Sequence, residues 1–374
     1  MTPPAVDART RLTDVDSGGI VPEIGSIAPE AAMGKPVRRF LGMLALALLV
    51  ISSPGAPAAA GIDDADPPGT PPRLIVGDAT THDPAIARSG NDWYVFSTGD
   101  PAVGGGAIQL RSSPDGRDWS YRGTVTPSIP GWVAAAVPGV VNLWAPDVSQ
   151  HDGRWFLYYA ASTFGSNRSV IGLLTSPTLD PSDPGYGWTD QGLVTESFAT
   201  DDFNAIDPSL TTDGQGRAWL SFGSFWSGIK MTEVFLPSGK PATSHPAHFD
   251  LVDRAAPPDA VEAPYVVRHG DWYYLFASFD FCCQGANSTY RVVVGRSDTI
   301  TGPYSDRNGT PLAHGGGSPF LDGVGAMRGP GGESVSGQTF AFHYYDAANG
   351  GTPHLGLGRL TWRDGWPVLT EVRI

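Results

Sequence analysis

Cysteine is scarce in this sequence: only Cys282 and Cys283 occur among 374 residues. Because the two are neighbours, they cannot cross-link distant parts of a fold, which excludes a disulfide framework. They could instead close a ring with each other in an oxidising compartment. A metal site would need more Cys or His residues at ligand spacing, so no metal site is expected from this pattern.

Basic residues are also few. Lys and Arg number 24 against 38 Asp and Glu, the net charge is −14, and no basic cluster occurs in the body of the chain. Because Lys and Arg are needed to displace the counterions of a phosphate backbone, nucleic acid is not an expected partner. The acidity itself serves solubility, and a neutral polymer would be a compatible substrate.

Long apolar runs are missing except near the N-terminus. The run at 40–51 follows Lys35, Arg38 and Arg39 and precedes small residues that end at Ala60. It is too short to cross a bilayer comfortably, and its flanks are typical of a secretory signal peptide. We therefore expect a secreted, extracellular protein that has no membrane attachment after cleavage.

These features divide the chain into four segments. We interpret 33–60 as the signal peptide and 1–32 as an extension ahead of it, with Met33 as the hypothetical true start. The Pro-, Gly- and Asp-rich segment 61–72 is expected to be a flexible leader, which leaves 73–374 as one folded domain.

Turn-forming and aromatic residues are abundant, with 48 Gly, 34 Pro, 11 Trp, 12 Tyr and 16 Phe, and this composition favours an all-β fold. A motif recurs along the chain: an X-Pro step beside an acidic residue, a strand, a tight turn, and a strand that opens on an aromatic residue. Its four clear copies begin at His82-Asp83-Pro84, Trp144-Ala145-Pro146-Asp147, Ile206-Asp207-Pro208 and Glu262-Ala263-Pro264, and a degenerate fifth copy begins at Gly331-Gly332-Glu333.

The repeat length identifies the architecture. Trp93, Trp155, Trp219 and Trp272 lie 62, 64 and 53 residues apart, and Phe340 follows 68 residues later. Units of this size with about four short strands predict a five-bladed β-propeller with about four antiparallel strands per blade. Because the innermost strands converge on the axis, the acidic residues of different blades should meet in a central channel, where we expect the active site.

Three acids flank X-Pro steps on successive inner strands: Asp83, Asp207 and Glu262. Asp147 is a fourth, placed after its proline. Asp-Pro steps commonly start turns, but three of them in phase with a propeller repeat indicate a function. Inverting hydrolysis of a glycosidic bond needs one carboxylic acid and one carboxylate about 6.5–9.5 Å apart, and a third carboxylate can raise the pKa of the acid.

The chain resembles glycoside hydrolase family 43 and, within it, the endo-1,5-α-L-arabinanases, from about residue 80 to the C-terminus. The most specific resemblance is carried by Glu262-Ala-Pro-Tyr, by the stretch from Trp272 through Phe-Asp280-Phe-Cys282-Cys283-Gln-Gly, and by Asn287-Ser-Thr-Tyr290. It implies that Asp83 is the general base and Glu262 the general acid. Asp207, rather than Asp147, would raise the pKa of the acid and orient both the acid and the sugar.

The expected substrate is arabinan or arabino-oligosaccharides, bound to a monomer. Aromatic side chains would form the sugar subsites, although each could equally be a core residue between blades. The candidates are Trp144, Phe164, Phe225 and Trp226, and the resemblance adds Gly165, Asn204 and Ser224 as polar contacts.

The sequence departs from the family at one position. Arabinanases often carry Gly-Pro-Gly-His in the last blade, with that His on a central calcium, whereas Gly332 stands at the His position here. No cofactor is therefore expected to be required, and the resemblance leaves open whether a central calcium is bound. We interpret the nearby His343 as a hydrogen-bonded structural residue.

Other functions stay open on the sequence alone. The same fold and acids would serve an exo-acting arabinofuranosidase or a β-xylosidase. A non-catalytic carbohydrate-binding propeller is a third hypothesis, because a fold does not fix a function. A retaining mechanism is weaker, since its nucleophile would have to lie only ~5 Å from the acid.

Overall fold

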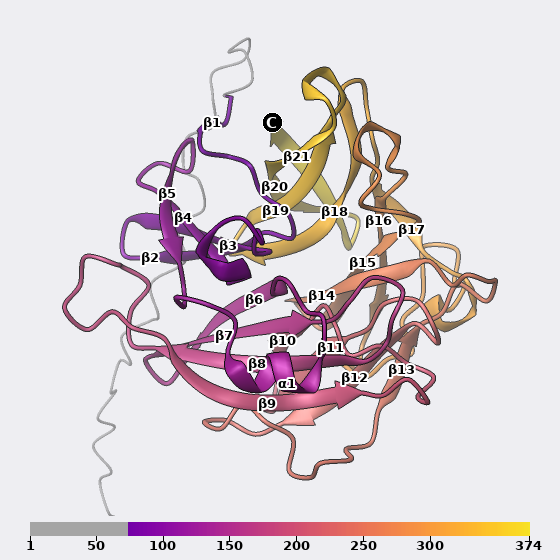
Figure 1. Ribbon diagram of the computed structural model, residues 1–374. Coiled ribbons are helices and arrows are strands. Elements are labelled where there is room, and N and C mark those ends of the chain that lie inside the picture. The colour runs from indigo at the N-terminus through magenta and orange to yellow at the C-terminus, as the bar shows by residue number, and fades with distance from the viewer. Residues whose placement is uncertain (1–73) are drawn as a thin grey trace, which may run out of the picture. The chain divides into compact units, whose positions relative to one another are not determined.

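The computed structural model describes residues 74–374. The predicted extension, signal peptide and leader at 1–72 lie outside the described residues. Five sheets form the described part of the chain, each sheet made from consecutive strands (Figure 1). The predicted all-β, five-bladed propeller is confirmed. Within 74–374 no helix is long and apolar enough to cross a membrane.

Each blade holds four antiparallel strands in chain order from the axis outward. The inner strands are β2 (Ala85–Ser89), β6 (Trp144–His151), β10 (Ser209–Thr212), β14 (Val261–His269) and β18 (Met327–Ser336). The second strands are β3 (Asp92–Ser97), β7 (Arg154–Ala161), β11 (Ala218–Phe222), β15 (Trp272–Phe279) and β19 (Thr339–Asp346). The third strands are β4 (Gln109–Ser113), β8 (Ser169–Ser176), β12 (Ile229–Val234), β16 (Arg291–Ser297) and β20 (Thr352–Arg363). The outer strands are β5 (Asp118–Thr124), β9 (Thr189–Ser197), β13 (Phe249–Val252), β17 (Ser318–Leu321) and β21 (Trp366–Arg373).

Few elements lie outside this pattern. The short strand β1 (Val76–Gly77) pairs in parallel with β5 and extends the first blade. The helical segments between strands are α1 (Gly131–Ala136) and the short 3-10 turns η1 (Gly104–Gly106), η2 (Gly285–Asn287), η3 (Leu312–His314) and η4 (Ala347–Asn349).

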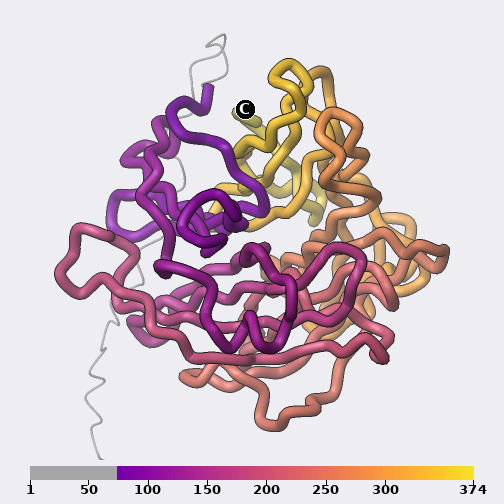
Figure 2. Tube along the Cα trace, viewed as in Figure 1, coloured from indigo at the N-terminus to yellow at the C-terminus, as the bar shows by residue number. Residues whose placement is uncertain are grey.

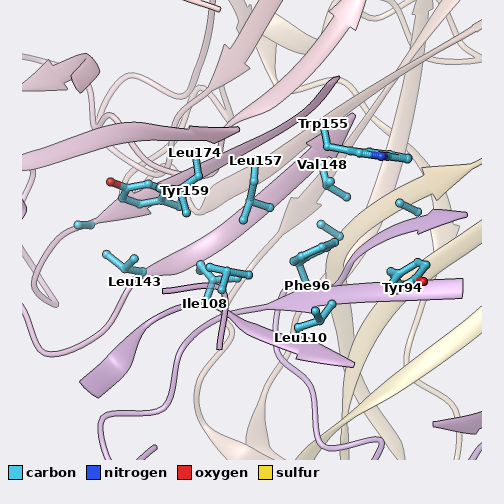
Figure 3. Close-up of a cluster of buried hydrophobic side chains, with 14 of the residues drawn as sticks. Tyr94, Phe96, Ile108, Leu110, Leu143, Val148, Trp155, Leu157, Tyr159 and Leu174 are labelled. Carbon is cyan, nitrogen blue, oxygen red and sulfur yellow. The ribbon is translucent and has the colours of Figure 1, made fainter. Parts of the chain in front are cut away.

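One hydrophobic cluster fills each interface between neighbouring blades. Strand β7 shows why its sequence is apolar throughout: Trp155, Leu157 and Tyr159 pack toward the first blade (Figure 3), whereas Phe156 and Tyr158 pack toward the third. Because successive side chains of a strand point to opposite faces, a sheet covered on both sides needs apolar residues at every position.

The ring closes between the last blade and the first. Ile86, Trp93 and Trp119 of the first blade pack with Leu355 and Leu357 of β20 in a single cluster. The N–H of Leu355 also donates to the carbonyl of Ala79 over 2.8 Å. The Cα trace accordingly brings the yellow C-terminal sheet beside the indigo start of the domain (Figure 2).

The X-Pro steps distort the inner edge of every blade. The residue before the proline has a positive φ in all five: Asp83 (50°), Ala145 (40°), Asp207 (57°), Ala263 (52°) and Gly329 (52°). The ladders of β6, β14 and β18 shift register at these steps. Because proline cannot donate to a ladder, the steps of these three strands form bulges, whereas β2 and β10 begin directly after their prolines.

Candidate active site

Three of the predicted acids share one cavity, which we call the acidic cavity. Asp83, Asp207 and Glu262, from the first, third and fourth blades, line a space of about 250 Å³. Asp83 and Asp207 have positive φ at their X-Pro steps, and the three acids meet here although they lie up to 179 positions apart in the sequence. The rest of its wall is formed by His82, Thr98, Asn142, Trp144, Phe164, Ile206, Cys282, Cys283 and Tyr290.

Asp83 is held as an ionised carboxylate. Its Oδ2 accepts a hydrogen bond from Thr98 Oγ1 (2.6 Å) and lies 2.7 Å from Nδ1 of His82. Burial alone would raise the pKa of Asp83, but the charge and hydrogen bond of His82 and the hydroxyl of Thr98 bring that pKa well below its ordinary value. A carboxylate that stays ionised at neutral pH can act as a base.

His82 is fixed in turn by the last blade. Its Nε2 lies 2.7 Å from the hydroxyl of Tyr345, and its ring stacks on His343 with the centroids 3.9 Å apart. Burial would lower the pKa of His82, but the neighbouring charge and hydrogen bond of Asp83 raise it. Sequence reasoning missed this residue, and the only available signal was its position directly before Asp83.

Glu262 lies between two hydroxyl donors. Ser224 donates to Oε2 (2.6 Å) and Tyr290 donates to Oε1 (2.7 Å). Burial raises the pKa of Glu262; both hydroxyls oppose this rise, and the charge of Asp83 adds to it, so that the pKa remains above its ordinary value. Tyr290 was not among the predicted site residues, although it ends the Asn287–Tyr290 string.

Asp207 faces the same cavity as Glu262, and the charge of Glu262 acts on it. Its Oδ2 accepts the backbone N–H of Ala263 (3.0 Å). Burial and the charges of Glu262 and Asp83 raise the pKa of Asp207 well above its ordinary value. Like charges in one cavity disfavour ionisation of both groups, so the pKa values of Glu262 and Asp207 are raised while that of Asp83 is lowered.

All seven predicted sugar contacts line a second space, the aromatic cavity, of about 530 Å³. Phe164 is 82% exposed and Trp226 is 40% exposed, so neither is a core residue between blades. The ring of Trp144 lies 5.3 Å from that of Phe164, and its Nε1 donates to Asn142. The lining residues from the prediction are Trp144, Phe164, Gly165, Asn204, Ser224, Phe225 and Trp226.

Two further acids face a narrow space on the axis, the axial cavity, of about 30 Å³. Asp147 does not line the acidic cavity; its Oδ2 accepts the N–H of Leu210 (2.9 Å), and burial raises its pKa to about 7. Glu333 accepts a hydrogen bond from Ser278 (2.7 Å), and burial raises its pKa to about 8. Neither group is placed to act on a ligand in the acidic cavity.

The residues around Gly332 do not fit a central calcium ion. A Cβ at Gly332 would lie 2.7 Å from Oδ1 of Asp83 and 2.8 Å from Nδ1 of His343. His82, Asp83 and His343 do place ligand atoms within 4.8 Å of one another. However, Nδ1 of His343 accepts the N–H of Asp83, burial keeps that ring neutral, and its proton is therefore on Nε2. Calcium prefers oxygen ligands, and the carboxylate of Asp83 already accepts other hydrogen bonds.

Comparison with known proteins agrees with this geometry. The chain is 40% identical over 291 residues to "Extracellular endo-alpha-(1->5)-L-arabinanase 1" of Bacillus subtilis, covering 76% of this chain and 86% of that protein. It is 39% identical over 305 residues to "Extracellular exo-alpha-(1->5)-L-arabinofuranosidase ArbA" of Cellvibrio japonicus, covering 78% and 86%.

A solved structure and a family profile also match this chain. The structure of "GH43 Endo-Arabinanase from Bacillus licheniformis" is similar with a TM-score of 0.74 and 41% identity, over 79% of this chain and 99% of that one. Residues 74–367 match the profile described as Glycosyl hydrolases family 43. The chain therefore belongs to glycosyl hydrolase family 43.

Proposed function

We propose that this protein is a secreted, inverting hydrolase that cleaves α-1,5-L-arabinofuranosidic bonds inside arabinan chains. The observation that carries the proposal is the acidic cavity, where Asp83 has a lowered pKa and the Glu262–Asp207 pair has raised ones. The names of both relatives support the substrate and the extracellular location.

In this mechanism Glu262 donates its proton to the glycosidic oxygen as the bond to the anomeric carbon breaks. Asp83 takes a proton from a water molecule whose oxygen attacks that carbon from the opposite face, which inverts its configuration. Ser224 and Tyr290 stabilise the Glu262 carboxylate that is left. Afterwards Asp83 gives up its proton and Glu262 regains one from solvent. The two carboxyls supply both proton transfers, so no cofactor is needed.

Endo action is supported by the way the two cavities meet. Trp144, Phe164, Ile206 and Glu262 line both the acidic and the aromatic cavity, so the proposed acid stands where they join. A chain that occupied both cavities would have sugars on each side of the bond beside Glu262. Exo action is the alternative, because one of the relatives is named as an exo-acting enzyme.

Brief digestion of linear arabinan tests the proposal. A spread of oligomers is expected at early times, and the anomer first released should have the inverted configuration by NMR. Glu262→Gln and Asp83→Asn should each lower kcat by at least about a hundredfold, because each removes a proton-transfer group.

Asp147→Asn is the matched control and should retain a measurable rate, since Asp147 lies outside the acidic cavity. Release of arabinose alone from the first time point would replace endo with exo action. Cleavage of an aryl β-xyloside in preference to arabinan would contradict the substrate.

A further inference from the structure

The fold does not explain why the only two cysteines of the chain are joined. Cys282 and Cys283 form a disulfide in the loop between β15 and η2. A disulfide stabilises a fold mainly by closing a loop in the unfolded chain, and the effect grows with the number of residues enclosed. Adjacent cysteines enclose none, so this bond contributes little to the stability of the propeller.

The position of the disulfide is informative. Both cysteines line the acidic cavity and the aromatic cavity, as Trp144, Phe164 and Glu262 do. The bond therefore forms part of the wall at the level of the proposed acid, where the two cavities join. Cys283 is exposed and Cys282 is partly exposed, so the sulfur atoms are accessible to a ligand.

The backbone around the pair is tightly fixed. Asp280, just before it, accepts hydrogen bonds from Arg254 (2.8 Å) and Arg291 (2.7 Å). The N–H of Cys283 donates to the hydroxyl of Tyr345 (2.8 Å). Asp280 and Cys283 both have positive φ, at 72° and 66°, which non-glycine residues keep only where surrounding contacts impose it. The disulfide is thus presented to the cavity on a rigid loop.

We propose that the Cys282–Cys283 disulfide is a sugar-binding surface at the cleavage point. A disulfide has no hydrogen-bond donor to desolvate, and its polarisable sulfur atoms can pack against the C–H face of a furanose ring. Trp144 and Phe164 would supply the aromatic part of the same wall. This inference rests on the proposed function, because the ring that it holds is an arabinofuranose residue of the substrate.

Reduction of the wild-type enzyme tests this surface directly. Dithiothreitol donates two electrons and two protons to the S–S bond, which becomes two thiols, while the reagent closes its own disulfide ring. Reduction is verified by a mass increase of two hydrogens. Two freely rotating thiols cannot form the same surface, so KM for linear arabinan should rise about five- to tenfold, while kcat changes less than about twofold.

The double variant Cys282→Ser/Cys283→Ser is the matched control. It should show the raised KM without treatment, and dithiothreitol should have no further effect because no other cysteine exists. The melting temperature should stay close to that of the wild type, as expected for a bond that encloses no residues.

Three outcomes separate the hypotheses. An unchanged KM in both the reduced enzyme and the double variant would overturn the sugar-binding surface while leaving the proposed function intact. A lowered kcat with an unchanged KM would also overturn it, because the loop would then act through Tyr345 and His82 on Asp83. If the untreated wild type does not cleave arabinan, the proposed function fails first, and this inference fails with it.

Discussion

Asp83 and Glu262 are both partly buried carboxyls in one cavity, yet the structure moves their pKa values in opposite directions. The difference lies in their immediate partners. Asp83 has His82 beside it, which favours the ionised form, whereas Glu262 has like charge nearby and only neutral hydroxyl donors. The residues that contact these two carboxyls thus give them different pKa values, as the proposed base and the proposed acid require.

The two hydroxyls on Glu262 lead to a prediction about pH dependence. Ser224→Ala and Tyr290→Phe each remove a donor that stabilises the carboxylate and lowers its pKa. The pKa of Glu262 should therefore rise in either variant, and the acid should stay protonated to higher pH. The alkaline limb of the kcat/KM profile on arabinan should move upward, even though the maximal rate falls.

Tyr186→Phe is the control for this pH experiment, because Tyr186 lines neither the acidic nor the aromatic cavity and its hydroxyl accepts a hydrogen bond from Trp188. Its pH profile should match that of the wild type. A downward shift of the alkaline limb in Ser224→Ala would show that the hydroxyl stabilises the protonated acid and would contradict its role as a donor to the carboxylate.

At the scale of strands, the inner edges of the blades were largely predictable. Proline cannot donate to a ladder, so each X-Pro step had to mark a strand edge or bulge, and the repeat spacing placed the four clear copies and the degenerate fifth around one axis. The sequence could not determine which acid enters which cavity. Asp147 follows its proline and faces the axial cavity, whereas Asp83 and Asp207 precede theirs and line the acidic cavity as well as the axial one.

The contacts that fix His82 and Asp83, the proposed base, could not be found in the sequence. His343 and Tyr345 come from β19 and reach the first blade across some 260 positions of chain. Their positions depend on how the ring closes, which no local pattern encodes. Ser224 was predicted as a polar sugar contact, and its hydrogen bond to Glu262 became apparent only once the third and fourth blades were placed together.

Blade packing also depends on glycine opposite aromatic residues. Gly356 on β20 pairs with Phe342 on β19, and a Cβ at Gly356 would lie 2.3 Å from the Phe342 ring. Gly356→Ala should therefore lower the free energy of unfolding by about 1–3 kcal/mol through overpacking, as measured by urea denaturation. Gly187→Ala is the control, since its Cβ would meet nothing within 4 Å, and it should change stability by less than ~0.5 kcal/mol. Equal stability of the two variants would show that the ring moves aside freely.

In the whole propeller, the contacts that close the ring of blades also hold the residues of the acidic cavity in place. The cluster between the last and first blades holds β19 and β20 against β2 and β3, and the same blades bring His343 and Tyr345 to His82 and Asp83. Any condition that opens this interface should therefore remove activity before the other blades unfold. Ionisation of the carboxyls that are buried on the axis is one condition that should destabilise the propeller.

Asp147 and Glu333 make the stability of the propeller dependent on pH. Both are buried at the axial cavity, and burial raises their pKa values from 3.8 to about 7 and from 4.5 to about 8. The folded state therefore binds protons that the unfolded chain releases. Their stabilising contribution is complete below the unfolded pKa values and is lost as pH rises through about 7 and then about 8. Each pH unit between the folded and unfolded values is worth ~1.4 kcal/mol per group.

The double variant Asp147→Asn/Glu333→Gln should remove most of this dependence, because the amides keep the shape of the carboxyls and cannot ionise. Urea unfolding at about pH 5 and about pH 9 should show a large loss of stability for the wild type and a much smaller one for the variant. Asp118→Asn, on the outer strand β5, serves as the control and should lose stability as the wild type does. Parallel losses in the wild type and the double variant would mean that water reaches the axial carboxyls and that they ionise there without penalty.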